Sequence, residues 1–293
     1  MNLIEDIKFQ YKIGNIAIRL IFWNLIFFII PEVFFAVAQL FHVNIDYLSF
    51  VSLSTNWNDL GWKPWSILSY AFFHAGVIHL VFNMLMLHFT SRLFLTFFSQ
   101  KQLFGVYIFS SIFSGLIYLL GYNFLPALSS VSTSIVGASG AIMAILIATT
   151  TYMPFMDVRL ALFGKVKLWQ IAILFLLVDL IQLPMNNTGG HIAHLSGAFF
   201  GYIYIKLLQN GTDMSRIVSA VIDFFANLFN PKKTTPFKKV HVNPKKPAVK
   251  RESRIIVKDK TQQQLDEILD KISQSGYDSL TAEEKEFLFK AGK

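Results

Sequence analysis

The sequence predicts an all-α polytopic membrane protein, from its composition, its long apolar runs and the placement of its charges. Of the 293 residues, 54% are hydrophobic, and the mean hydropathy is +0.49, which is too apolar for an ordinary soluble domain of this size. Apolar runs of the length that crosses a bilayer, or slightly shorter, follow one another along the chain. They lie at about 16–37, 74–95, 104–121, 139–153, 168–184 and 191–208. We therefore expect a bundle of six membrane-spanning helices.

The N-terminal part predicts a short cytoplasmic segment followed by a retained span. Residues 1–15 are mixed in charge. The first apolar run is too long for the hydrophobic part of a signal peptide and has no cleavage-site pattern after it. Glu32 lies towards the far end of this run. An acid at this position is better explained by a solvated helix end than by a functional role.

Two connections between the apolar runs are unusual. The connection over 39–73 is long and contains several aromatic rings that suit a membrane interface, among them Trp57, Trp62 and Trp65. The connection over 122–138 contains no charged residue, so it can dip into the membrane where protein surrounds its backbone. It precedes the fourth run, which is short for a full crossing.

Lys and Arg in the short loops predict the orientation of the bundle. They flank the first run, separate the second run from the third and the fourth from the fifth, and follow the sixth: Lys8, Lys12, Arg19, Arg92, Lys101, Arg159, Lys165, Lys167, Lys206 and Arg216. The alternate loops hold only Lys63. We therefore expect both termini in the cytoplasm and a multi-pass protein in an inner membrane of the bacterial type.

The C-terminal part predicts three further segments. Residues 210–230 are expected to form an amphipathic helix along the inner membrane face. Residues 231–260 carry eleven Lys and Arg against two acids and no periodicity, which predicts a disordered basic linker. Its role is either attraction to anionic inner-leaflet lipid or that of a soluble spacer. Residues 261–293 predict a small helical hairpin that needs a partner of unknown identity to fold firmly.

Composition and motifs exclude several classes of function. The net charge of +8 is concentrated in the basic linker, so the remainder is nearly neutral and does not suggest nucleic-acid binding. The chain has no cysteine, which excludes disulfides, thiolate zinc sites and Cys nucleophiles. A zinc-protease helix needs the pattern H-E-x-x-H, whereas His79 and Asn83 enclose no Glu. We expect no metal and no cofactor.

Polar residues gather near the predicted outer ends of three runs. The second run begins with His74, His79 and Asn83, the fourth with Ser139, and the sixth with His191 and His194. At about 1.5 Å per helical residue, all of them lie within roughly two turns of the same membrane surface. Because each polar side chain is costly in lipid, three helices with such residues at one depth indicate a functional site.

The spacing within these runs supports a serine-based chemistry. Serine is a weak nucleophile unless a base takes its proton and hydrogen-bond donors hold the oxyanion. Gly137, Gly197 and Gly201 belong to stripes of small residues that let two helices pack closely, as a direct hydrogen bond between Ser139 and His194 needs. Small residues alone are equally explained by helix packing, and a transporter pathway would need inverted repeats or paired charges, which we do not see.

These patterns together resemble the rhomboid family of intramembrane serine proteases. The patterns His79-x-x-x-Asn83, Gly137-x-Ser139-Gly140 and His194-x-x-Gly197-x-x-x-Gly201 occur in this order on the second, fourth and sixth runs. The resemblance covers roughly residues 16–209 and implies a six-helix protease domain whose active site opens to the extracytoplasmic side. It also implies that the substrates are transmembrane proteins.

The resemblance assigns a role to each matching position. Ser139 would be the nucleophile and His194 the general base, while Asn83, His79 and the Ser139 backbone N–H would form the oxyanion hole. The supporting positions would be His74, Gly137, Gly140, Gly197 and Gly201. No acid is expected to orient His194, so the pair would act without a third carboxylate. Asp179 stands alone in the fifth run and is expected to cap or hydrogen-bond locally.

The sequence also departs from the family pattern. Ser66 stands where many members have an Arg beside the loop tryptophan, and Met143 replaces an aromatic residue that packs on the histidine in many relatives. The alternative function is that of a catalytically inactive relative that binds and routes transmembrane clients. Members of that class have usually lost the Ser or the His, and both are present here.

Overall fold

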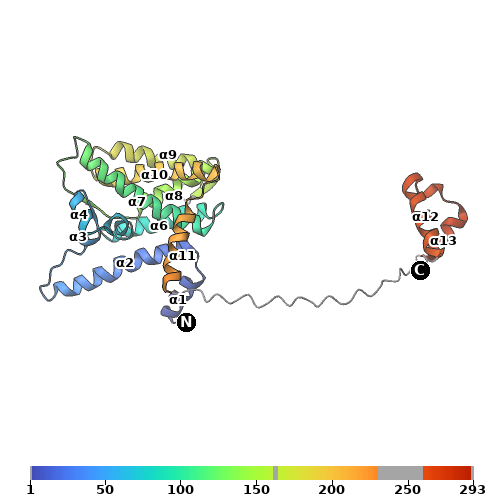
Figure 1. The fold of residues 1–293 in the computed structure, drawn as a ribbon, viewed down its shortest axis with the longest axis horizontal. Helices are drawn as coiled ribbons and strands as arrows, with labels where there is room; N and C mark the ends of the chain where they lie inside the picture. The colour runs from blue at the N-terminus through green and yellow to red at the C-terminus, as the bar shows by residue number, and fades with distance from the viewer. Residues whose placement is uncertain (1, 161–163, 230–259, 292–293) are drawn as a thin grey trace. The chain divides into compact units, whose positions relative to one another are not determined.

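The computed structural model describes residues 2–160, 164–229 and 260–291 (Figure 1). Its contacts divide the chain into two compact units, Met1–Lys232 and Lys233–Lys293, which are described separately below. The linker predicted over 231–260 lies, apart from its last residue, outside the described residues.

The first unit is built almost entirely of helices. The longer ones are α1 (Leu3–Ile13), α2 (Ile16–Gln39), α6 (Val77–Phe94), α7 (Gln100–Phe124), α8 (Ser139–Tyr152), α9 (Leu168–Gln182), α10 (Thr188–Gln209) and α11 (Ser215–Phe229). Short helical turns fill the long connection after α2: α3 (Leu48–Val51), α4 (Trp57–Trp62), α5 (Ser66–Ser69) and η1 (Tyr70–Phe72). Among the described helices, α2, α6 and α7 are long and apolar enough to cross a membrane, and α8 and α9 are shorter apolar helices.

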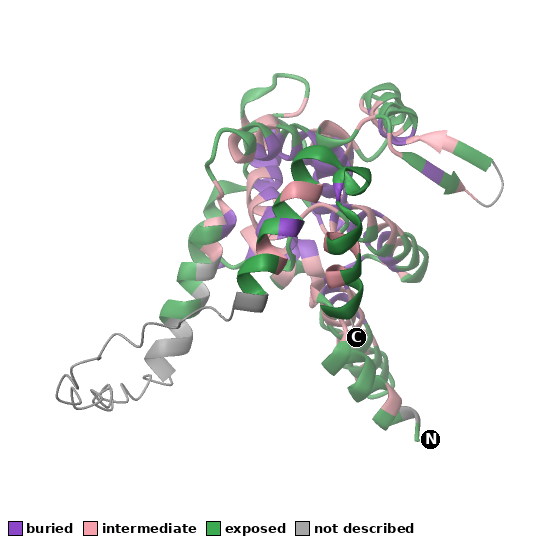
Figure 2. Cartoon of the chain, turned by 90° about the vertical axis from the view of Figure 1, so that its right-hand side faces the viewer, coloured by how far each residue is buried: buried purple, intermediate pink, exposed green. Residues whose placement is uncertain are grey.

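Helix α8 forms the centre of this unit. It packs against α6, α7 and α10, and every residue from Gly140 to Thr149 is buried. A helix that is apolar on all sides is stable only where protein or lipid surrounds it. Figure 2 shows the buried residues gathered in the middle of the bundle.

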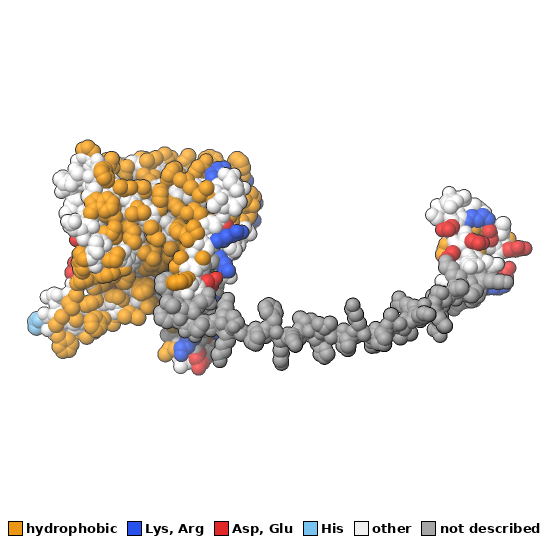
Figure 3. All heavy atoms as spheres, viewed as in Figure 1, with side chains coloured by type: hydrophobic (Ala, Val, Ile, Leu, Met, Phe, Trp, Pro, Cys, Tyr) orange, Lys and Arg blue, Asp and Glu red, His pale blue; other side chains and the backbone are white. Residues whose placement is uncertain are grey.

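The outer surface of the first unit is largely apolar. Hydrophobic side chains cover most of the face that Figure 3 shows. Large apolar residues of α2 and α6 are more than half exposed, including Ile30, Phe34, Ile78 and Leu85. An exposed apolar surface of this extent fits contact with lipid.

Four short strands in the described part of the chain depart from the all-α prediction. β1 (Leu53–Ser54) pairs antiparallel with β2 (Ser134–Ile135), with Leu53 opposite Ile135. β3 (Asp157–Leu160) pairs antiparallel with β4 (Gly164–Lys167) between α8 and α9. The all-α prediction is wrong in this respect, because backbone N–H and C=O groups in a connection still need partners. The β1–β2 pair joins the two unusual connections that precede α6 and α8.

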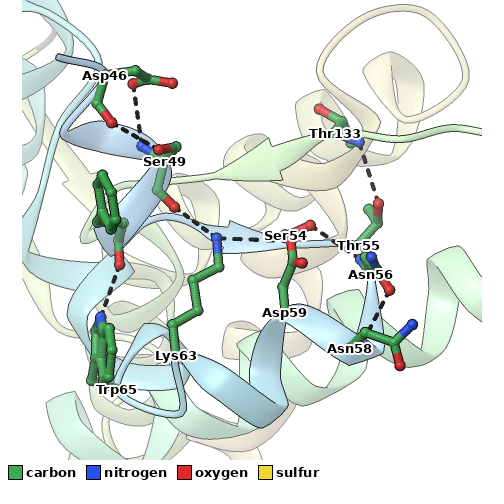
Figure 4. Close-up of polar contacts among 11 residues, drawn as sticks. Asp46, Ser49, Ser54, Thr55, Asn56, Asn58, Asp59, Lys63, Trp65 and Thr133 are labelled. Carbon is green, nitrogen blue, oxygen red and sulfur yellow. Dashed lines mark hydrogen bonds and ion pairs between the residues drawn. The ribbon is translucent and has the colours of Figure 1, made fainter.

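Polar side chains hold the long connection between α2 and α6 in place (Figure 4). The Lys63 Nζ atom donates to the Ser49 carbonyl oxygen at 2.6 Å and lies 3.8 Å from the Asp59 carboxylate. The Trp65 indole N–H donates to the Phe50 carbonyl oxygen at 2.8 Å. Ser66 is buried, and its hydroxyl has no hydrogen-bond partner among the described residues, so other residues carry the polar contacts of this connection.

The second unit contains α12 (Lys260–Ser275), the single turn η2 (Tyr277–Ser279) and α13 (Ala282–Ala291). Lys271 on α12 lies 2.8 Å from the Glu284 carboxylate on α13. Glu284 also accepts from the Thr281 backbone N–H at 2.7 Å, and the Thr281 hydroxyl accepts from the Glu284 N–H at 3.3 Å. This reciprocal pair is a capping box that begins α13.

Candidate active site

A cavity of about 560 Å³ lies among α6, α8, α9 and α10. Most of its wall is apolar, which is usual for a ligand site, and a few polar groups converge on it. The side chains with polar groups that line it are Tyr70, His79, Asn83, Ser134, Ser139, Asp179, Asn187, His191 and His194. The structure thus brings both residues of the predicted Ser–His pair and both predicted side-chain oxyanion donors to one cavity.

Ser139 is the first residue of α8. The first backbone N–H groups of a helix have no partner within the helix, and the helix dipole makes this end favourable for negative charge. Gly137, two residues earlier, has a φ of 132°, and its N–H donates to the Tyr70 carbonyl oxygen at 2.8 Å. A Cβ atom at Gly137 would lie 2.9 Å from the His79 ring. Glycine is therefore required here by the backbone conformation and by the approach of His79.

The glycines of α10 bring its backbone against that of α8. A Cβ atom at Gly197 would overlap the Gly140 carbonyl oxygen, and one at Gly201 would overlap the Ala144 carbonyl oxygen. A Cβ atom at Gly140 would in turn lie 3.0 Å from the Ala193 carbonyl oxygen. These contacts place the start of α8 beside the turn of α10 that carries His194.

Asp179 on α9 links two histidines of α10. The Nδ1 atoms of His191 and His194 lie 2.7 Å and 2.8 Å from the same Asp179 oxygen, Oδ1. Both Asp179 and His191 are buried, and the His194 side chain is 24% exposed. Because an ionised carboxylate can only accept hydrogen bonds, this geometry calls for a proton on each Nδ1. In the neutral ring of His194, Nε2 then carries no proton.

This cluster corrects two predictions. Asp179 does not stand alone, and an acid does lie within hydrogen-bond distance of His194. The sequence prediction failed because the sequence of an apolar helix that carries a single acid does not indicate which neighbouring helix that acid faces. A usable signal was present: a buried acid needs donors, and α10 carries two histidines near the same end of the bundle as Asp179.

The predicted direct hydrogen bond between Ser139 and His194 is not formed among the described residues. Both side chains nevertheless line the same cavity. Hydrogen bonds between a nucleophile and its base are often long before substrate is bound and shorten in the complex. The two side chains therefore share a cavity without a preformed hydrogen bond between them.

The remaining predicted residues lie on the α6 side. The Asn83 side-chain amide donates to the His79 carbonyl oxygen at 2.9 Å, and both residues line the cavity. His74 is fully buried, and its ring packs edge-on against His79 at 5.1 Å between centroids. Neither ring nitrogen of His74 has a hydrogen-bond partner among the described residues.

Asp179, His191 and His194 are also the group of described residues that could hold a metal ion, with ligand atoms within 4.8 Å of one another. Two ligands on a tetrahedral zinc ion with bonds of 2.0–2.1 Å lie roughly 3.3 Å apart. The separations of 2.7 Å and 2.8 Å are instead those of hydrogen bonds between ionisable groups.

The apolar exterior of the helical bundle fits a membrane protein, and its cavity holds a serine and a histidine beside a helix N-terminus. The chain matches the rhomboid domain over residues 61–210, which is half of its length, and it belongs to the rhomboid family. It is therefore a polytopic helical membrane protein of a family that includes serine proteases. Residues 256–290 match a family of unknown function (DUF6576). No curated protein matches the chain.

Proposed function

We propose that this protein is an intramembrane serine endopeptidase that hydrolyses peptide bonds in transmembrane proteins. The observation that carries the proposal is the placement of Ser139 and His194 in one cavity, on two helices whose backbones touch through Gly197 and Gly201. Close approach of these helices is what a serine and a histidine on different helices need in order to act on one substrate atom.

Four polar residues of the cavity would then have a chemical role. The Ser139 hydroxyl attacks the scissile carbonyl carbon while Nε2 of His194 takes its proton, and His194 returns the proton to the leaving amine. A water molecule repeats the sequence to release the acyl group from Ser139. Asn83, His79 and the Ser139 N–H would hold the negative charge on the tetrahedral intermediate, so Asn83→Ala should lower turnover by roughly 10²- to 10³-fold.

The proposed topology follows from the helices and the charges. Six helices, α2, α6, α7, α8, α9 and α10, would cross the membrane within a protease domain over 16–209. Lys and Arg side chains lie along one edge of the first unit in Figure 3, which supports a cytoplasmic position for that edge and for both termini. The cavity would open to the extracytoplasmic side, near the N-termini of α6, α8 and α10.

The flanking segments would serve attachment. Residues 1–15 would lie in the cytoplasm, 210–230 would lie along the inner membrane face, and the basic segment 231–260 would attract anionic lipid. The matched family at the C-terminus has no known function, so the partner of 261–293 stays unidentified.

The test is cleavage of a transmembrane reporter by purified protein in liposomes. Wild type should cut the reporter, and Ser139→Ala and His194→Ala should not. Matched controls are Ser110→Ala, whose hydroxyl donates to the Val106 carbonyl oxygen within α7, and His88→Ala, outside the cavity; both should retain cleavage. Reporter binding without cleavage by wild type would instead favour the inactive, client-binding relative.

A further inference from the structure

We infer that Asp179 is a positioning residue that fixes the tautomer and the orientation of His194, so that the site works as a serine, a histidine and an acid from three helices. For catalysis this rests on the proposed function. The fixed tautomer itself is a property of the folded protein that can be measured whether or not the protein cleaves anything.

The first step of the argument is the hydrogen bond between α9 and α10. Nδ1 of His194 lies 2.8 Å from Oδ1 of Asp179. The two nitrogens of an imidazole ring point in widely different directions, so a hydrogen bond from Nδ1 to the acid turns Nε2 away from α9. The neutral ring then carries its proton on Nδ1 and offers Nε2 as the acceptor, which is the form that a serine nucleophile needs from its base.

The second step is the cost of placing this acid in the bundle. Asp179 is 4% exposed and is the one charged residue in the sequence of α9, which is otherwise apolar apart from two glutamines. A buried carboxylate is costly unless donors satisfy it, and in a membrane helix it usually marks a functional position. An apolar side chain would pack α9 against α10 without that cost, so packing alone does not explain an acid here.

The third step is the second histidine. His191 donates to the same carboxylate oxygen at 2.7 Å and is buried. The carboxylate is therefore held from two points one turn apart on α10, which restricts its rotation. His191 thus acts through Asp179 and is itself a positioning residue.

The charged and titratable groups that line the cavity around His194 come from four elements. They are Asp179 of α9, His191 of α10 itself, His79 of α6 and Tyr70 of η1. The sequence of α8 contains no charged residue, and no residue of α7 lines the cavity. Asp179 is thus the one acid among the residues that line the cavity, and replacing it removes the only negative charge there.

The direct test is the proton position on His194 in protein with ¹⁵N-labelled histidine, assigned with His194→Gln and His191→Gln. Wild type in lipid at neutral pH should show His194 with its proton on Nδ1. Asp179→Asn should shift His194 towards the Nε2–H form. The control is Glu32→Gln, since Glu32 also accepts a hydrogen bond in a membrane helix, from the Tyr47 hydroxyl at 2.7 Å. It should leave the His194 signals unchanged. An unchanged tautomer in Asp179→Asn would overturn the inference, whatever the protein cleaves.

The second test is the rate of reporter cleavage. Asp179→Asn should lower kcat/KM by on the order of 10²- to 10⁴-fold, with a thermal midpoint close to that of wild type. Asp179→Glu should restore part of the rate.

Three outcomes of this second test would contradict the inference. The first is an unchanged rate in Asp179→Asn. The second is a rate that falls only with the folded fraction, which would indicate a structural role. The third is wild-type activity that a chelator abolishes and Zn²⁺ restores, which would make the three residues a metal site. An inactive wild type with the expected tautomer would instead refute the proposed function and leave the positioning intact.

Discussion

Where α8 contacts α10, glycine residues set the distance between the two helix backbones because they carry no side-chain carbon. Gly197 and Gly201 face the carbonyl oxygens of Gly140 and Ala144, and a methyl group at either glycine would need the space that those oxygens occupy. Dense packing transmits such a change as a displacement of the helix. The geometry of the cavity therefore depends on residues that are themselves without reactive groups.

Replacing Gly197 by Ala tests this dependence. We expect a loss of roughly 1–3 kcal/mol in the free energy of unfolding, together with slower cleavage, because α10 must move away from α8. The matched control is Gly61→Ala, where a Cβ atom would meet nothing within 4 Å. Thermal unfolding in detergent and reporter cleavage measure the two effects. Equal stability and activity of the two variants would contradict the close-packing account.

At the scale of elements, the connection between α2 and α6 is a built structure that borders the site. The β1–β2 pair ties it to the segment that leads into Ser139, and Lys63 ties it to Ser49. Lys63 is only 5% exposed, so contacts within the protein hold its ammonium group in place.

Lys63→Met keeps most of the side-chain stem and removes the charged donor. We expect a loss of about 1–3 kcal/mol in the free energy of unfolding, since the Ser49 carbonyl oxygen loses a hydrogen bond from a charged group. Residues 39–73 should also become more sensitive to added protease. Asp59→Asn weakens only the contact at 3.8 Å and should have a smaller effect. If both variants resist proteolysis like wild type, Lys63 does not hold the connection.

The stability of the small α12–α13 unit should depend on pH because of the Glu284 carboxyl group. The Lys271 ammonium group and the Thr281 backbone N–H hold the pKa of Glu284 below its ordinary value of 4.5. The stabilisation is therefore complete above that ordinary value and is lost as the pH falls through the lowered pKa. Amide exchange of residues 260–291 in the full chain, corrected for intrinsic rates, should lose protection in acid in wild type.

Glu284→Gln should reduce that protection already at neutral pH and flatten its pH dependence. Glu283→Gln, in the same first turn of α13 and exposed, is the matched control and should behave like wild type. The same acid-induced loss in Glu284→Gln as in wild type would show that another group is responsible.

The sequence predicts the positions of the helices better than it predicts which elements contact one another. The positions of the apolar helices follow from composition and run length, and the family follows from three spaced patterns. The β1–β2 pair could not be predicted, because two-residue strands leave no periodic signal. Asp179 could be recognised as unusual, but its contact with His194 depends on how α9 crosses α10, which one sequence does not specify.

At the scale of the whole molecule, the proposed function requires a transmembrane substrate to enter a cavity inside a helical bundle. Such a substrate would itself be a helix, and its scissile carbonyl group would have to leave its own helical hydrogen bond before Ser139 could reach it. We expect a preference for a small residue at the cut and for segments that unwind easily.

A reporter with Gly or Pro near the cut should therefore be cleaved faster than the same reporter with Leu at those positions. Initial rates in liposomes at matched protein-to-lipid ratio measure this preference, with a reporter altered at its distant end as the control. Equal rates for the Gly- or Pro-containing reporter and its Leu variant would contradict the need for unwinding.

The most direct measurement of the central claim is the site at which a fluorophosphonate probe binds covalently to the full chain in lipid. Peptide mapping by mass spectrometry should find the adduct on Ser139 in wild type, no adduct in Ser139→Ala, and strongly slowed labelling in His194→Ala. Unmodified Ser139 in folded wild-type protein, or labelling that is as fast without His194 as with it, would contradict the account.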